Sequence, residues 1–300
     1  PRTDTKYTVY HVVMIPKDMT TTPSSGFNPH DGDKILDEYT EILQGTTGAS
    51  VDVLKTSEVY KTGIKGYTFD EAGTAGYGKT QQTIAADGST EFVLYYKANE
   101  YTLTFTDENG ENPISIKYQF ATKINLPLNT FKKTGYSFAG WKVEGVEGVI
   151  ADGALYVITD KDVTFKATFK ANTVKVTLDK QDGKGGIDEI SATYDSEIAD
   201  LVASNLPTRE GYTFAGYYTE VGAKGTMFFD NTGKVNSALT TWAFENDATL
   251  YAAWTANPYT ITFNPNGGEG GTETLKVTFA EQPSNISVPT RAGYIFAGYY

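Results

Sequence analysis

Short stretches of alternating apolar and polar residues recur along the chain. In Tyr101–Phe105 (YTLTF), Val174–Leu178 (VKVTL) and Tyr259–Phe263 (YTITF), every second side chain is apolar. A period of two is typical of a strand that buries one face and leaves the other in water. Two further stretches, Val163–Phe169 (VTFKATF) and Thr249–Trp254 (TLYAAW), predict additional strands downstream. We therefore expect a β-rich chain.

A motif of glycine and aromatic residues follows each of the alternating stretches that begin at Tyr101, Val174 and Tyr259. It reads GYSFAGW at Gly135–Trp141, GYTFAGYY at Gly211–Tyr218 and GYIFAGYY at Gly293–Tyr300, and a looser copy, GYTF, begins at Gly66. The same spacing separates Tyr101 from Gly135 and Tyr259 from Gly293. Repetition of order and spacing indicates tandem modules.

The repeats predict four modules, at residues 1–98, 99–171, 172–256 and 257–300, which we call modules 1 to 4. Module 4 stops inside its motif, so we expect the chain to be part of a longer protein. The joints are very short: Asn99-Glu100, Asn172 and Asn257-Pro258. Short joints, one with a proline that fixes φ, leave little freedom, so we expect an elongated, semi-rigid rod.

Between the first hairpin and the motif, module 3 has a stretch with helical spacing. In Ser196–Leu206, the apolar residues Ile198, Leu201 and Val202 fall at i, i+3 and i+4, and Ser196 is a candidate N-cap. The predicted order in a module is strand, strand, short helix, strand, strand. This order predicts a small α+β domain with one helix across a β-sheet.

The motif residues are predicted to be structural. We expect the leading glycines to occupy turns that a Cβ would strain. The tyrosine and phenylalanine of each motif share parity with its second glycine, so these side chains should face the core, whereas Trp141 and Tyr217 or Tyr299 should point to the opposite face. The candidate residues of this repeat motif are Gly135, Tyr136, Phe138, Gly140, Trp141, Gly211, Tyr212, Phe214, Gly216, Gly293, Tyr294, Phe296, Gly298 and the downstream Trp254.

Composition excludes several classes of protein. The 300 residues include no cysteine and two histidines, and the formal net charge is −12. A disulfide scaffold, a zinc finger and a cysteine nucleophile are therefore excluded. Strong negative charge disfavours nucleic acid and anionic membranes as partners. No apolar run approaches the length of a membrane span, so we expect no membrane insertion.

No constellation of residues predicts catalysis, a cofactor or a metal. The carboxylates are scattered over turns, and the chain has no nucleophile elbow, P-loop or dinucleotide fingerprint. The stretches Asp31–Asp33 and Asp179–Asp182 lack the spacing of a calcium loop. His11 alternates with apolar residues and should pack against the sheet, whereas His30 falls in a polar loop, residues 20–32. We expect a protein that is not an enzyme.

The chain resembles two bacterial repeat families. PNGGEGG at 265–271, Pro289-Thr290-Arg291 and the motif at Gly293 resemble the Listeria–Bacteroides repeat, an internalin-type B-repeat, and modules 2 and 3 resemble it too. Module 2 departs from it, because Lys132-Lys133-Thr134 stands in place of Pro-Thr-Arg. Module 1 is similar to mucin-binding-protein (MucBP-like) repeats, through features that we list: Tyr7–His11 (YTVYH), Gly45–Gly48 (GTTG), Gly66-Tyr67, Asp87-Gly88 and Tyr95-Tyr96.

The resemblance implies ubiquitin-like β-grasp modules in secreted, wall-attached or S-layer-associated bacterial proteins. The absence of cysteine fits an exported protein of a Gram-positive bacterium better than a cytosolic one. The family resemblance also bears on Ile35–Leu43: the apolar spacing fits a helix, whereas the resemblance implies a strand at Tyr39–Gln44. The expected function is an extracellular stalk or adhesin segment, with host glycans, mucin or cell-wall polysaccharide as partners. The alternatives are a lectin-like glycan-binding module and an accessory region of a secreted enzyme.

Overall fold

The computed structural model describes the chain except for residues 15–32, 56–62 and 78–79. His30 and the loop at 20–32 therefore lie outside the described residues. The chain divides into two compact units, which we describe separately. The first comprises residues 1–132 and 138–169, and the second comprises residues 133–137 and 170–300.

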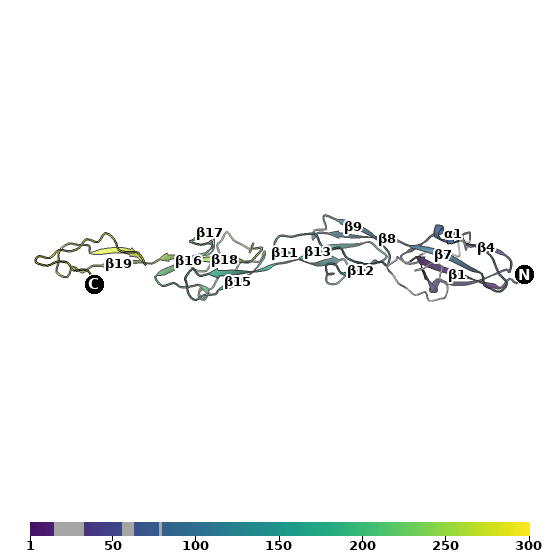
Figure 1. Cartoon of the computed structure of the whole chain (residues 1–300), viewed down its shortest axis with the longest axis horizontal. Coiled ribbons are helices and arrows are strands. Elements are labelled where there is room, and N and C mark those ends of the chain that lie inside the picture. Colours follow the sequence, from purple (N-terminus) through teal and green to yellow (C-terminus); the bar gives the residue numbers. More distant parts are fainter. Residues whose placement is uncertain (15–32, 56–62, 78–79) are drawn as a thin grey trace. The chain divides into compact units, whose positions relative to one another are not determined.

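The first sheet of unit 1 lies in module 1 and is built around two parallel strands, β1 (Thr5–Met14) and β7 (Glu91–Ala98). Helix α1 (Glu71–Tyr77) packs against β7 (Figure 1). The other strands of this sheet are β2 (Asp33–Ile35), β3 (Glu41–Gly45) and β5 (Tyr67–Phe69), in the order β2-β1-β7-β5 with β3 on β1. A small sheet joins β4 (Ser50–Asp52) and β6 (Gln81–Thr83).

The second sheet of unit 1 has the order β11-β13-β8-β9. Strands β8 (Glu100–Thr106) and β9 (Ile114–Gln119) form a hairpin, and β13 (Val163–Ala171) runs parallel to β8. The motif strand β11 (Tyr136–Val143) lies at the edge beside β13. Strands β10 (Lys123–Asn125) and β12 (Leu155–Val157) form a separate pair.

Unit 2 repeats this arrangement in module 3, with the order β15-β14-β18-β16-β17. Its strands are β14 (Thr173–Asp179), β15 (Glu189–Thr193), β16 (Tyr212–Glu220), β17 (Lys224–Phe229) and β18 (Ala248–Ala256). Again the first and closing strands, β14 and β18, are parallel. In module 4, β19 (Pro258–Thr262) and β20 (Thr274–Thr278) form a hairpin.

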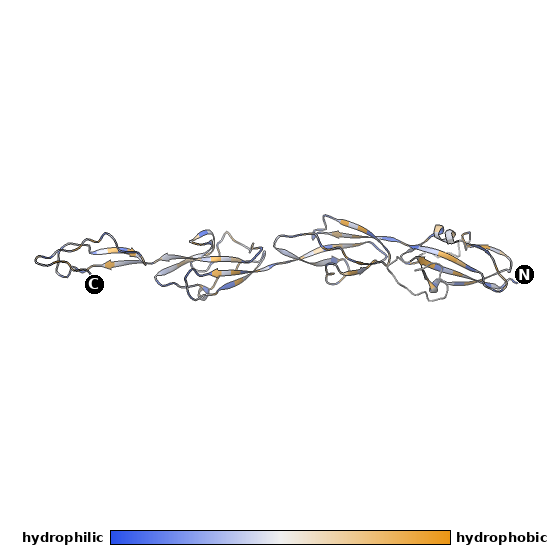
Figure 2. Ribbon diagram, viewed as in Figure 1, coloured by the Kyte–Doolittle hydropathy of each residue, from blue (hydrophilic) through white to orange (hydrophobic). Residues whose placement is uncertain are grey.

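The predicted strands are confirmed. The alternating stretches that begin at Tyr101, Val174 and Tyr259 lie in β8, β14 and β19, and the downstream stretches lie in β13 and β18. Burial follows the alternation: in β14, Val174, Val176 and Leu178 are buried, and the lysine and the threonine between them are more exposed. Figure 2 shows hydrophobic and hydrophilic residues succeeding one another along the strands.

The helix predicted at Ser196–Leu206 is wrong. This segment is extended apart from a short 3₁₀ turn, η2 (Ala203–Asn205). Its backbone pairs with a distant stretch: the amide of Leu201 donates to the carbonyl of Gly233, and the amide of Trp242 donates to that of Ser196. Ile198 and Leu201 are buried as expected. The apolar spacing was thus real, but tertiary partners satisfy the backbone without a helix.

The β-rich part of the predicted fold class is confirmed, since the described part of the chain is 46% strand and 4% helical. Among the described residues, α1 of module 1 is the one α-helix. In the ambiguous stretch Ile35–Leu43, the strand interpretation is confirmed, because a 3₁₀ turn, η1 (Asp37–Tyr39), leads into β3. No helix in the described ranges is long and apolar enough to cross a membrane.

Candidate functional site: the repeated motif and its turn clamp

Phe138 and Phe214 pack in the cores of modules 2 and 3, as predicted. Phe138 packs against Trp141 at 5.0 Å between ring centroids, and Phe214 packs against Tyr217 at 5.2 Å. Trp141 and Tyr217 are fully buried in the same clusters. The prediction that Trp141 and Tyr217 point to the opposite face is therefore wrong.

A β-bulge at the second glycine explains the error. The pairing of β16 with β18 shifts between Phe214 and Gly216, so the next aromatic returns to the core face. Gly140 and Gly216 have φ of +134° and +130°, and a Cβ on Gly216 would lie 2.5 Å from the carbonyl oxygen of Phe229. Only glycine fits this position. Gly298 of module 4 has the same conformation, with φ of +136°.

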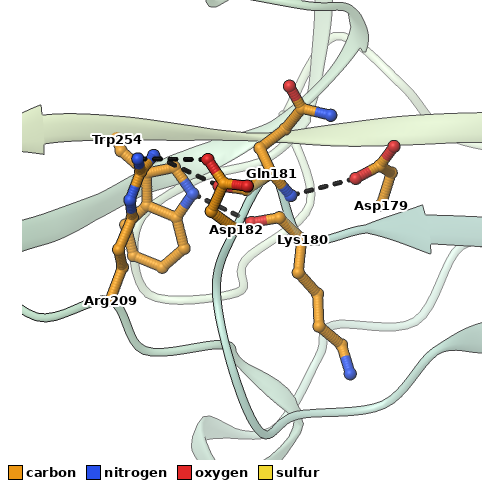
Figure 3. Close-up of polar contacts among 6 residues, drawn as sticks. All are labelled: Asp179, Lys180, Gln181, Asp182, Arg209 and Trp254. Carbon is orange, nitrogen blue, oxygen red and sulfur yellow. Dashed lines mark hydrogen bonds and ion pairs between the residues drawn. The ribbon is translucent and has the colours of Figure 1, made fainter.

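In module 3, the loop between β14 and β15 is held by two side chains from distant elements (Figure 3). Arg209 donates to the carbonyl of Gln181 and pairs with Asp182, both at 3.2 Å. Trp254 Nε1 donates to the carbonyl of Lys180 at 2.9 Å. We call this arrangement the turn clamp. It assigns a structural role to the arginine before the motif and to Trp254.

Module 4 repeats the arginine half of the clamp. Arg291 donates to the carbonyl of Asn266 at 3.3 Å, and the guanidinium also stacks 4.4 Å from the ring of Tyr294. Arg209 stacks on Tyr212 at the same distance. In module 2, the Lys133 ammonium takes this place, 4.2 Å from the ring of Tyr136. The cation–aromatic contact therefore survives where the Pro-Thr-Arg sequence does not.

The first two motif residues do not belong to the cores. Gly135 and Gly211 have φ of +75° and +76°, as expected for turn glycines, and an aromatic ring from a later hairpin covers each of them. Tyr136 and Tyr212 are half-buried and belong to neither core cluster, so the prediction that they face the core is wrong. In module 4, Gly293 has the same φ sign but nothing within 4 Å of its Cβ position. Tyr294 and Phe296 are 68% and 38% exposed, so the prediction that they face the core is wrong as well.

The titratable groups fit a structural interpretation. His11 is completely buried, as predicted, and its Nδ1 lies 2.8 Å from the hydroxyl of Tyr96. Burial, together with the charges of Asp179 and Asp188, raises the pKa of the Tyr217 hydroxyl. In the part of the chain that the structure describes, no three His, Asp or Glu side chains gather in a group that could hold a metal ion.

The exposed turn carboxylates have low pKa values. The hydroxyl of Thr232 and nearby backbone amides donate to Asp230 and lower the pKa of its carboxyl group. The amide of Glu111 and the side chain of Asn112 do the same for Asp107. In both cases the carboxylate accepts hydrogen bonds that close a turn.

Successive β-sheet modules that share one motif, the same φ at its second glycine and a cation against its tyrosine define a tandem-repeat protein. The Listeria-Bacteroides repeat domain matches residues 101–168, 175–253 and 259–300, more than half of the chain. The chain therefore belongs to this family, as the motifs predicted. The match does not reach module 1, so its likeness to mucin-binding repeats stays a prediction.

The chain is also similar to parts of longer proteins. A putative Gly-rich membrane protein of Evansella cellulosilytica is 27% identical over 227 residues, which is 74% of this chain and 24% of that protein. A second putative membrane protein of the same organism is 27% identical over 69% of this chain and 29% of its own length. Internalin H of Listeria monocytogenes is 34% identical over 69% of this chain and 32% of its own length. The chain thus spans less than a third of these relatives.

Proposed function

We propose that this chain is a non-catalytic repeat region of an extracellular bacterial surface protein, in which β-grasp modules form a rod that presents other parts of the protein. The observation that carries the proposal is the repetition itself. Modules 2 and 3 have separate cores and the same strand order, and joints of one or two residues link successive modules. The names of the relatives, membrane proteins and an internalin, support a surface location.

The β-grasp assignment rests on topology. In both complete motif-bearing modules, a hairpin supplies the first two strands, and the closing strand runs parallel to the first and antiparallel to the motif strand in module 3. The extended segment at Ser196–Leu206 takes the place of the helix. This order supports the proposal, because a β-grasp sheet whose crossover helix is replaced by irregular backbone would have the same pairing.

Small-angle X-ray scattering of the chain tests the rod. A compact protein of this length has a radius of gyration of about 19 Å. A rod of four modules should give a radius at least about twice that value and a pair-distance distribution with a long tail. A radius near 19 Å would contradict the stalk function, whatever the chain binds.

The adhesin role needs a separate test. A glycan-binding platform needs exposed aromatic faces, and among the described residues of modules 1 to 3 no aromatic side chain is mostly exposed. The exposed aromatics lie in module 4: Tyr259, Phe279, Tyr294, Phe296 and Tyr300. This distribution favours a spacer over a lectin-like module.

Binding of the chain to mucins, host matrix proteins and wall polysaccharides should be measured at low and high salt. A spacer predicts no saturable binding to any of them. Saturable binding that persists at high salt would contradict the spacer role and favour the lectin-like alternative, because screening removes only charge-driven association. Deleting residues 257–300 would then test whether the exposed aromatics carry it.

A further inference from the structure

An asparagine at each joint makes the same three hydrogen bonds. At the first joint, which lies within unit 1, the Asn99 amide donates to the carbonyl of Gly66 at 2.9 Å, and the Asn99 carbonyl accepts from the amide of Phe120 at 2.8 Å. The hydroxyl of Thr68 donates to Asn99 Oδ1 at 2.6 Å. Asn99 thus connects the motif strand of module 1 with the first hairpin of module 2.

An aromatic ring completes the contact. Phe120, directly after β9, lies over Gly66, so that a Cβ on this glycine would lie 2.3 Å from the ring. The same ring meets Tyr67 edge-on, with centroids 5.3 Å apart. Gly66 has φ of +80° and has no side chain, and both properties are needed for the ring to lie against the backbone. Lys65 and Asp160 add an exposed ion pair at 3.4 Å.

The other two joints, both within unit 2, reproduce these contacts with other residues. Ser137 and Thr213 each donate to the joint asparagine at 2.6 Å, and rings cover the motif glycines as Phe120 covers Gly66. The three sets of glycine, motif tyrosine, hydroxyl donor, asparagine and ring are Gly66, Tyr67, Thr68, Asn99 and Phe120; Gly135, Tyr136, Ser137, Asn172 and Tyr194; and Gly211, Tyr212, Thr213, Asn257 and Phe279.

Chance does not explain three identical sets. The five residues of a set come from three separate stretches of sequence. The residue after each ring, Ala121, Asp195 or Ala280, also has a left-handed backbone. The module on one side supplies the glycine, tyrosine and hydroxyl, and the module on the other supplies the ring. Rotation about the joint would break the hydrogen bonds and the ring contact together.

We propose that this contact, the joint clasp, is a docking interface by which each module recognises the module that follows it. The partner of each module is the module that follows it, which is recognised by its joint asparagine and by the aromatic residue at the end of its first hairpin. The clasp restrains bending at the joint and shields the hydrogen-bonded backbone amides at the joint from water. It goes beyond the stalk proposal, because it holds or fails at a single joint, whatever the surface location or shape of the whole protein.

Distance measurements between two spin labels across the first joint test the clasp. The chain has no cysteine, so labels attach only to engineered ones, at Lys6→Cys in β1 and Lys166→Cys in β13, both exposed positions. Pulsed electron–electron double resonance then gives the width of the distribution of distances between the two labels. Gly66→Ala should at least double this width, because the new methyl group displaces the Phe120 ring.

Gly48→Ala is the matched control. Gly48 also lies in module 1 and has φ of +82°, but nothing lies within 4 Å of its Cβ position. It carries the backbone strain of the substitution without touching the joint, and the width should be unchanged. Equal broadening in both variants, or none in a folded Gly66→Ala chain, would overturn the proposal.

A second variant guards against misfolding of Gly66→Ala. Thr68→Val removes only the hydroxyl that donates to Asn99 and keeps the shape of the side chain. Amide hydrogen exchange by NMR should then be at least tenfold faster at Asn99 and Phe120, whose amides donate within the clasp. Exchange should be unchanged at Val176 in β14. Unchanged exchange at both joint amides would overturn the proposal even if Gly66→Ala cannot be studied.

Discussion

Phe214 shows how a single motif residue holds a module together. Its side chain is 8% exposed and meets Tyr217 and Trp254 edge-on, at 5.2 and 5.6 Å between centroids. Trp254 in turn fixes the loop of the turn clamp. Edge-to-face contacts of this kind add to the free energy gained from burial. One side chain therefore connects the motif strand, the closing strand and the clamped loop.

Truncation of Phe214 should destabilise module 3. We expect Phe214→Ala to lower the free energy of unfolding by about 3–5 kcal/mol, because it removes buried surface and leaves a cavity. Urea unfolding followed by tryptophan fluorescence measures this directly, since Trp242 and Trp254 both lie in module 3. Val221→Ala in the same module, at a residue 54% exposed, should cost less than about 0.5 kcal/mol. A loss below about 1 kcal/mol for Phe214→Ala would contradict the core role.

At the scale of elements, strands were predictable and their local irregularities were not. Alternation located β8, β13, β14, β18 and β19 because burial of one face depends on the local pattern alone. Parity failed at Tyr217 because the bulge at Gly216 inserts one residue into the alternation. At Trp141 it failed after Gly140, which has the same unusual φ. A glycine repeated inside a strand is the signal that could have revealed them.

The helix error has a different origin. Ile198 and Leu201 are buried at helical spacing, yet the segment stays extended because residues 233–242 supply backbone partners. Those partners follow in the sequence and cannot be deduced from the segment itself. Helical spacing in such a short stretch indicates which residues are buried but does not predict the backbone conformation. An isolated short helix is only marginally stable in water, so tertiary contacts decide the conformation.

The turn clamp was only half visible in the sequence. Pro-Thr-Arg before the motif was recognised as a repeated feature, but its partners were not, because Arg209 bonds to the loop at 179–186 through a backbone carbonyl. Backbone acceptors leave no trace in the sequence. The loop sequences of modules 3 and 4 differ at most positions, yet Gln181 and Asn266 share a left-handed φ of 48° and the same arginine contact.

At the scale of the whole molecule, the joints were predicted as short segments and the clasp was missed. The asparagines at 99, 172 and 257 stood out only as linkers. Their hydroxyl and aromatic partners lie far away in sequence, and the rings at Phe120, Tyr194 and Phe279 differ in type. Contacts between neighbouring modules couple the stabilities of the units of a repeat protein, so the joints are where one module can stabilise the next.

Charge acts on the whole molecule in two opposing ways. The net charge of −12 means that carboxylates repel one another near neutral pH, and protonation relieves this repulsion. The turn carboxylates act in the other direction, because Asp87, Asp107 and Asp230 accept hydrogen bonds when ionised, which lowers the pKa of each. A carboxyl group with a lowered folded pKa stabilises the fold above its unfolded pKa and loses that contribution as the pH falls through the folded value.

The thermal midpoint of unfolding should therefore hold steady or rise slightly from pH 7 to 5 and fall below about pH 4, the unfolded pKa of aspartate. Circular dichroism between pH 7 and pH 2 measures it. The double variant Asp107→Asn, Asp230→Asn keeps an acceptor oxygen in each turn but removes the titrating carboxyl groups. Its thermal midpoint should therefore fall less at acid pH than that of the parent chain. An acid limb unchanged in this variant would show that the turn carboxylates do not control acid stability, and a fall already between pH 7 and 5 would show that groups other than these titrate.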